Sequence, residues 1–327
     1  MAISKGTSVG KPRVFIDLIA FAKAVGTSIG YADDNHASLF DMNPAKITSI
    51  GTNSSFNISI DINEDDYELH KLLGTVNYFA VLGHSLVTGD ISDDIYSLSS
   101  LNMAYSSSTS PYTHTSYLPL GDAYSLDGYR IDLLSDNNVD LSYGYSVEHG
   151  GDGLIDVGTF SIGRYFDFPN APDLDVQFTL SHEGIKKKRT IGGSDIVSVN
   201  YHAPPNWGDR KPWTSGENYR HSGYNGRRSW KVKFSYIDHD NVMPQGMNED
   251  FMVDNVINDP ESWITHSSEN IMSHFLTLTL NGSLPFIFQP DVNLDQLAIC
   301  RLDKPSTSIK QVAHKAYSIS MNFVESW

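Results

Sequence analysis

Cysteine is almost absent from this chain, which has a single one, Cys300, among its 327 residues. One cysteine cannot form a disulfide within the chain, so folding needs no oxidising compartment and suits assembly in a reducing cytoplasm. The apolar neighbours Leu297 and Ile299 offer no base that would activate the thiol. We therefore expect Cys300 to be buried and inert rather than a nucleophile.

Long hydrophobic runs are also lacking. The apolar stretch 14–25 is interrupted by Asp17 and Lys23, and a membrane-spanning helix needs about 20 consecutive apolar residues. The same interruption, with no clean cleavage pattern after it, argues against a secretory signal peptide. We expect a protein that does not insert into membranes and is not secreted by the general route.

Positive charge is scarce, with 23 Lys and Arg against 39 Asp and Glu and a net charge of −16. This balance argues against a chain that binds nucleic acid over its whole surface. The basic segment, residues 184–233, reverses the sign: it holds 11 basic and 3 acidic residues, against 8 and 24 before it and 4 and 12 after it. The basic segment can pair with an acidic surface of a neighbouring copy, although a solvated face without a partner explains the same counts.

Catalytic motifs are missing as well. The chain has no HExxH, no glycine-rich phosphate loop, no GxSxG elbow and no CxxC. Asp136, Asn138 and Asp140 resemble the start of a calcium-binding loop, but Leu141 replaces the required glycine and Val147 stands at the twelfth position. We therefore expect no catalytic residue, cofactor or metal site, and a protein that is not an enzyme.

The clearest signal that is present is the alternation of apolar and polar residues. The apolar runs 286–288 and 297–300 flank a polar turn, which predicts a β-hairpin. Tyr317, Ile319 and Met321 alternate with polar residues and predict the next strand of an antiparallel meander. The pattern indicates an all-β fold that is β-rich with a few short helices, with further strand signals at residues 56–62, 75–87, 129–133, 139–145, 176–180 and 230–236.

Two segments are ambiguous between strand and helix. Residues 12–26, PRVFIDLIAFAKAVG, are too continuously apolar for periodicity to decide, and we favour a strand that enters the core. Residues 268–282 fit either state, and we favour a helix that Ser268 caps and Gly282 ends. Residues 97–127 are rich in Ser, Thr and Tyr and are expected to form a long surface excursion.

Aromatic and basic residues interleave within the basic segment. This mixture suits a protein interface, where Trp, Tyr and Arg supply most anchors, and we prefer that interpretation. Stacking and cation–π contacts with a sugar or a single-stranded nucleic acid are the alternative. The candidate interface or glycan contacts are Trp207, Trp213, Tyr219, Arg220, Tyr224, Arg227 and Arg228.

Several segments resemble virion structural proteins of tailed bacteriophages. They are PRVFIDLIAFAKAVG, NYFAVLGHSL, SIGRYFDFPNAPDLDVQF, LPFIFQPDVNLDQLAICRLD and AYSISMNFVESW. The NYFAVLGHSL region also looks like the core of galactose-binding-like, discoidin-type jelly rolls. That resemblance implies an N-terminal jelly-roll-like β-sandwich with long loop insertions in residues 1–183, followed by a β-rich C-terminal assembly domain with an antiparallel sheet in residues 184–327. It assigns no residue a sugar-binding role.

The resemblance implies a structural component of the virion, a minor tail protein of the tail tip or baseplate, assembled in the host cytoplasm. Its expected partners are copies of itself in a ring and other tail proteins, with no nucleic acid and no membrane insertion. The alternative is a receptor-binding tail module that recognises a host-surface glycan. A polysaccharide hydrolase is a third possibility, which the lack of a catalytic motif disfavours.

Overall fold

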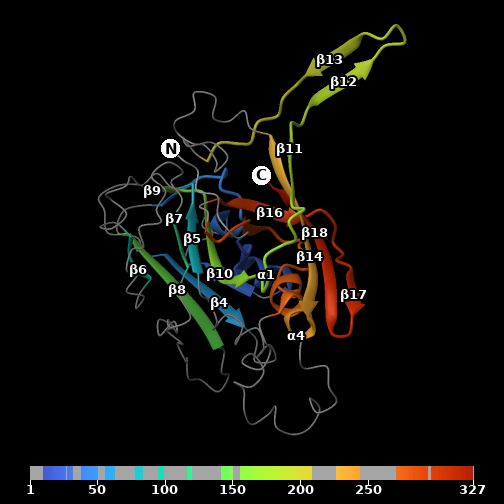
Figure 1. Ribbon diagram of the computed structural model, residues 1–327. Coiled ribbons are helices and arrows are strands. Elements are labelled where there is room, and N and C mark those ends of the chain that lie inside the picture. Colours follow the sequence, from blue (N-terminus) through green and yellow to red (C-terminus); the bar gives the residue numbers. More distant parts are fainter. Residues whose placement is uncertain are drawn as a thin grey trace, which may run out of the picture.

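The computed structural model describes residues 10–26, 28–31, 38–50, 56–62, 78–83, 95–98, 116–119, 141–149, 155–207, 226–243, 270–293 and 296–326 (Figure 1). Strands dominate these residues and the helices among them are short, so the predicted all-β class is confirmed. The predicted strand 129–133 and the helical capping residue Ser268 lie outside the described residues.

One antiparallel sheet of ten strands forms the centre of the molecule. Nine strands follow the order β11-β14-β18-β16-β15-β1-β10-β5-β7, and β17 pairs with β18 off this path. The strands are β1 (Arg13–Asp17), β5 (Tyr78–Leu82), β7 (Ser116–Pro119), β10 (Thr159–Asp167), β11 (Gln177–Ser181), β14 (Arg227–Asp238), β15 (Phe286–Gln289), β16 (Ala298–Leu302), β17 (Ile309–Ala313) and β18 (Ala316–Glu325).

The predicted C-terminal hairpin and the strand after it are present. Strands β15 and β16 pair through Phe286 with Cys300 and Phe288 with Ala298, and β16 then pairs with the last residues of β18. Strand β17, which the alternation did not predict, pairs with the first residues of β18. Because β14 pairs with β18 on the other side, β16 and β17 share one edge of this ten-residue strand.

The large sheet crosses the point at which we predicted a domain boundary. Strand β1 lies between β10 and β15, so residues near the start of the chain pair directly with residues near its end. Strand β11, before residue 183, pairs with β14, after it. The division into residues 1–183 and 184–327 and the jelly-roll connectivity stay predictions, and the sheet joins both parts.

Three smaller sheets accompany the large one. Four strands pair in the order β2-β4-β8-β6, while β3 pairs with β9 and β12 with β13. Strand β4 matches the predicted strand 56–62, and β7 in the large sheet arises from within the predicted excursion 97–127. The bounds are β2 (Ser28–Tyr31), β3 (Thr48–Ile50), β4 (Phe56–Ile62), β6 (Ile95–Leu98), β8 (Leu141–His149), β9 (Ile155–Val157), β12 (Ile185–Arg189) and β13 (Asp195–Val199).

Among the described residues, three short helices pack beside the large sheet: α1 (Leu18–Ala24), α4 (His239–Val242) and the π-helix η4 (Ile271–Thr277). The preference for a strand over residues 12–26 is correct only up to Asp17. Its carboxylate accepts a hydrogen bond from the Ala20 amide at 3.0 Å and so caps α1. The helix predicted over residues 268–282 is present as the shorter η4, which Asn270 caps in place of Ser268 and which ends at Thr277 rather than at Gly282.

The central strands of the sheet are buried on both faces. On one face, Val14 and Ile16 belong to a cluster that includes Phe288 and Phe323. On the other face, Phe15 packs with Ile287, Ile299 and Tyr78. Successive residues of a strand point to opposite faces, so β1, β15 and β16 each supply both clusters. These strands are therefore continuous apolar runs in the sequence, and for the segment that contains β1 this left strand and helix undecided.

The alternation of buried and exposed residues along β14 changes at a bulge. Trp230, Val232 and Phe234 are buried as predicted, but Tyr236 is exposed and Ile237 is buried in its place. The register with β18 shifts between Phe234 and Ile237, and Tyr236 has a φ of 61°. A β-bulge adds one residue to a strand and so exchanges the faces of the residues after it.

Candidate functional site

The structure describes three of the seven residues proposed as interface or glycan contacts. Trp207, Arg227 and Arg228 are described, whereas Trp213, Tyr219, Arg220 and Tyr224 lie outside the described residues. The three described side chains do not form one exposed patch. Each has a separate role in or near the core, as the following contacts show.

Trp207 is buried and belongs to the cluster that contains Phe15, Met42 and Tyr78. Its Cβ lies 3.1 Å from the position that a Cβ on residue 83 would take, so Gly83 is needed for this close approach. Gly83 also has a φ of 70°, which favours glycine. The Trp207 ring thus covers one face of the sheet, and its role as an interface or glycan contact stays a prediction.

Arg228 forms a nearly buried ion pair with Glu325. Its Nη2 donates to Glu325 Oε1 at 2.6 Å, and its backbone amide donates to Oε2 at 2.9 Å. Nη2 also donates to the Leu297 carbonyl at 3.0 Å, and the guanidinium lies over the Trp230 ring. Arg228 thus ties β14 to β18 and to the residue before β16, and its role as an interface or glycan contact stays a prediction.

Arg227 lies at the start of β14, where its Nη1 is 3.1 Å from Glu183 Oε1. Glu183 follows β11 and precedes β12. This ion pair therefore holds the root of the segment that projects from the sheet. Part of the Arg227 side chain remains exposed, so a role in an interface stays open for this residue.

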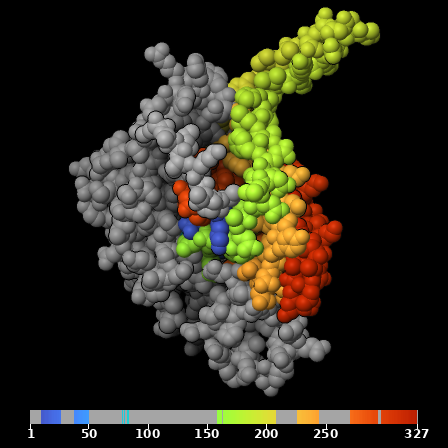
Figure 2. Space-filling view, viewed as in Figure 1, coloured from blue at the N-terminus to red at the C-terminus, as the bar shows by residue number. Residues whose placement is uncertain are grey.

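A β-hairpin arm projects from the body of the molecule (Figure 1). It consists of β12 and β13, which pair from Ile185 with Val199 to Arg189 with Asp195. All ten of these strand residues are exposed. Figure 2 shows the arm standing clear of the rest of the surface. An isolated two-stranded hairpin is at best marginally stable in water, so an arm of this kind gains stability from a partner.

Apolar side chains gather on β11 and on the arm. Nine of the exposed large hydrophobic residues fall in this one stretch of the described chain: Leu174, Val176, Phe178, Leu180, Ile185, Ile191, Ile196, Val197 and Val199. Phe178 and Leu180 face the same way as buried residues of β14, since they pair with Trp230 and Arg228. The core face of the sheet thus continues onto β11 and becomes exposed there.

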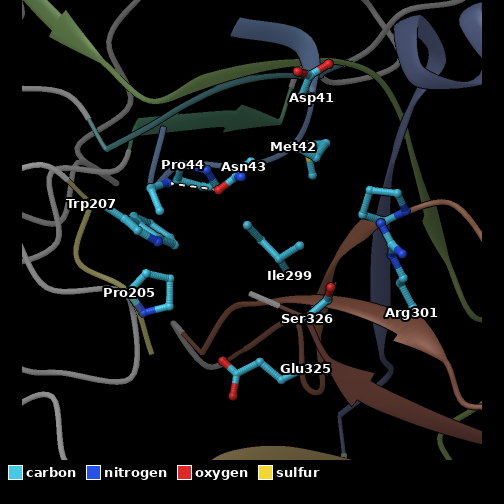
Figure 3. A pocket seen from close by; sticks show the side chains of 12 residues that line it. Asp41, Met42, Asn43, Pro44, Pro205, Trp207, Ile299, Arg301, Glu325 and Ser326 are labelled. Atoms are coloured by element: carbon cyan, nitrogen blue, oxygen red, sulfur yellow. Dashed lines mark hydrogen bonds between the residues drawn. The ribbon is translucent and has the colours of Figure 1, made fainter. Parts of the chain in front are cut away.

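A pocket of about 310 Å³ lies beside Trp207 (Figure 3). Its lining combines apolar residues with polar ones from distant parts of the chain, including Asp41, Asn43, Trp207, Arg301, Glu325 and Ser326. The two carboxylates already have partners: Asp41 accepts from Lys23 at 2.9 Å, and Glu325 accepts from Arg228. The pocket offers hydrogen-bonding groups beside an aromatic ring rather than a paired acid and base.

Apart from the pocket, a group of three polar side chains, Asp17, Tyr78 and Ser161, is enclosed in the sheet near α1. The Tyr78 hydroxyl lies 2.7 Å from Ser161 Oγ, and Asp17 is buried at the end of β1. Burial raises the pKa of Asp17 to about 7, although the hydrogen bond from the Ala20 amide opposes this. Burial, together with the Asp17 charge, raises the pKa of Tyr78 well above its usual value. The group is enclosed by the core and does not open on the pocket beside Trp207.

Among the described residues, no three His, Cys, Asp or Glu side chains gather as metal ligands. Cys300 is buried, as predicted, and burial raises the pKa of its thiol well above the usual value, which keeps the thiol protonated. Within the same part of the chain, no helix is both long and apolar enough to cross a membrane.

No known protein family matches this chain, and a search of curated proteins finds no relative of it.

Proposed function

We propose that this protein is a structural component of a bacteriophage virion, a minor tail protein of the tail tip or baseplate. It works through protein–protein contacts and catalyses no reaction. The observation that carries the proposal is the exposed stretch 174–199, which includes β11 and the arm and carries nine large exposed apolar side chains. Exposed apolar surface of this extent is typical of an interface.

The resemblance of the apolar segments to tail proteins supports the same proposal. The proposed partners are copies of this chain in a ring and other tail proteins, and the proposed location is the virion tail after assembly in the host cytoplasm. The basic segment lies in a chain with a net charge of −16. A basic surface that meets the acidic surface of the next copy is a heterologous contact, and contacts of this type form a ring when the rotation between copies closes.

Electron microscopy of purified virions labelled with a gold-conjugated antibody against this chain tests the proposal. We expect gold at the tip of the tail, at a site shared by all particles. A chain that is absent from purified particles, or that lies only on the head, contradicts it. The charge-pairing version has a separate test, since molar salt should dissociate a ring held by ion pairs.

The pocket beside Trp207 supports a second candidate, a receptor-binding tail module for a host-surface glycan. A sugar needs an apolar or aromatic surface and a few placed hydrogen-bonding groups. The pocket brings Trp207, Asn43 and Arg301 together. A glycan array with the isolated protein tests this candidate. Binding that Asn43→Ala abolishes supports it, and an array without any bound glycan removes it.

A further inference from the structure

The outer edge of β11 has no strand beside it within the described residues. β11 is the last strand of the large sheet and pairs only with β14. Natural edge strands are usually protected by Lys, by Pro or by a bulge. β11 has the sequence QFTLS, without Lys or Pro, and its register with β14 shows no bulge. Phe178 and Leu180 on its core face are 55% and 46% exposed. This edge is therefore open to an added strand.

The two strands of the arm differ in whether their outer edge is protected against an added strand. β12 has the sequence IKKKR, so lysines protect its outer edge. β13 has the sequence DIVSV, with three β-branched apolar residues and no cation. Its single charge, Asp195, is already paired with Lys187 at 2.9 Å. Such residues favour strand pairing, and β13 pairs only with β12 in the described part of the chain. The arm thus has one protected edge and one open edge.

The open edge strands β11 and β13 each carry exposed apolar side chains on one face. Val197 and Val199 lie on one face of the arm with Ile185, because Ile185 pairs with Val199. These valines are 53% and 67% exposed. A strand placed beside β11 with the valines on its core face would cover Phe178 and Leu180. Cross-strand pairs of aromatic and β-branched residues stabilise a sheet by about 0.2–1 kcal/mol each.

We propose that β13 in the arm of one copy adds to the open edge of β11 in a second copy. This inference rests on the proposed function and names its self-contact. The added strand satisfies the backbone groups of both open edges and covers both apolar faces. The occupant is a second copy because the two complementary edges occur in the same chain. The contact joins two different surfaces, so every bound copy still offers one arm and one edge for the next.

The test uses the full chain with one glutamate placed on each side of the contact. Val197→Glu blocks the arm, and Leu180→Glu blocks the edge. Val197 and Leu180 are 53% and 46% exposed in the single chain, so a carboxylate at either position stays in contact with water. Both variants should therefore fold, which circular dichroism checks. Val312→Glu on β17 is the matched control, because Val312 is similarly exposed and lies outside the contact.

We expect the natural chain and Val312→Glu to associate in sedimentation experiments, and each blocked variant alone to sediment as a monomer. A mixture of the two blocked variants should form dimers and stop at two, because the intact arm of one meets the intact edge of the other. A natural chain that remains monomeric overturns the inference. So does a Val197→Glu chain that associates normally, or a mixture that stays monomeric.

Failure of this inference can be told from failure of the proposed function. A chain that sediments as a monomer but is labelled at the tail tip keeps its proposed function and loses the self-contact. A chain that associates through β11 and β13 but is missing from virions keeps the contact and loses the tail function.

Discussion

Arg228 and Glu325 are 97 residues apart in the chain and form a bidentate ion pair at the junction of β14 and β18. Their side chains are only 16% and 7% exposed. Removing one member of such a pair leaves the other charge buried without its partner, which is costly. This relationship makes Glu325 a structural residue, although it also lines the pocket beside Trp207.

Glu325→Gln should lower the free energy of unfolding by about 3 kcal/mol, because Arg228 loses its counter-charge in a nearly buried site. Urea unfolding followed by circular dichroism measures the change. Asp195→Asn is the matched control. Asp195 pairs with Lys187 on the exposed arm, where an ion pair contributes less than about 1 kcal/mol. Equal losses in the two variants would contradict the structural role of Glu325.

Phe323→Ala should lower the free energy of unfolding by about 3–5 kcal/mol, because it empties the centre of the larger core cluster. The Phe323 ring stacks on Phe288 with centroids 4.1 Å apart and also contacts Phe275 and Phe286. Urea unfolding measures the loss. Phe178→Ala on the exposed edge strand serves as the control, with an expected loss below about 1 kcal/mol in the monomer. A mild effect at Phe323 would mean that the cluster is not the core.

Two buried groups give stability opposite dependences on pH. Folded Asp17 keeps its proton up to a pKa of about 7, whereas the unfolded carboxyl loses it near 3.8, so Asp17 lowers stability as pH rises between these values. Burial, followed by the nearby Arg164 charge, lowers the pKa of His274 to about 4 from 6.5. The unfolded imidazole is therefore protonated before the folded one, and His274 lowers stability as pH falls from 6.5 to 4.

The two contributions oppose each other between pH 4 and 6.5, at about 1.4 kcal/mol per pH unit each. Asp17→Asn keeps an oxygen that can accept from the Ala20 amide and removes the titration, so its stability should rise with pH in this window. His274→Gln should show the reverse slope. Urea unfolding of both variants and the natural chain across the window measures these slopes. Parallel curves for all three proteins would exclude the buried Asp17 and His274 as titrating groups.

Gly163→Ala should lower the free energy of unfolding by about 3 kcal/mol, because overpacking a tight site forces backbone shifts. A Cβ on residue 163 would collide with the Ile16 carbonyl oxygen of the neighbouring strand and lie 2.9 Å from the Leu18 amide nitrogen. The thermal unfolding temperature reports the loss. Gly192→Ala provides the comparison, since a Cβ there lies 4.0 Å from its nearest contact, Thr190 Oγ1. We expect Gly192→Ala to unfold like the natural chain.

Part of the candidate site could be predicted from composition and part could not. The sequence locates the basic segment and its aromatic residues, and β11, β12 and β13 lie in or beside it. It does not reveal that Trp207 faces the core or that Arg228 is held by Glu325. Trp and Arg serve cores and interfaces equally well, and only the packing around each side chain decides between them. One feature of the sequence pointed to the exposed arm. This feature is the run Lys186–Arg189, because such a cluster of cations is typical of a protected edge strand.

By itself the sequence determined the all-β class, the C-terminal hairpin and the buried Cys300, because period-two alternation and apolar runs are local properties of the chain. Tertiary structure alone decided that β1 lies between β10 and β15, that the chain turns into helix α1 after Asp17, and that β14 changes faces at Tyr236. Those outcomes depend on contacts between residues far apart in sequence, and alternation along one segment does not specify which other segment it will meet.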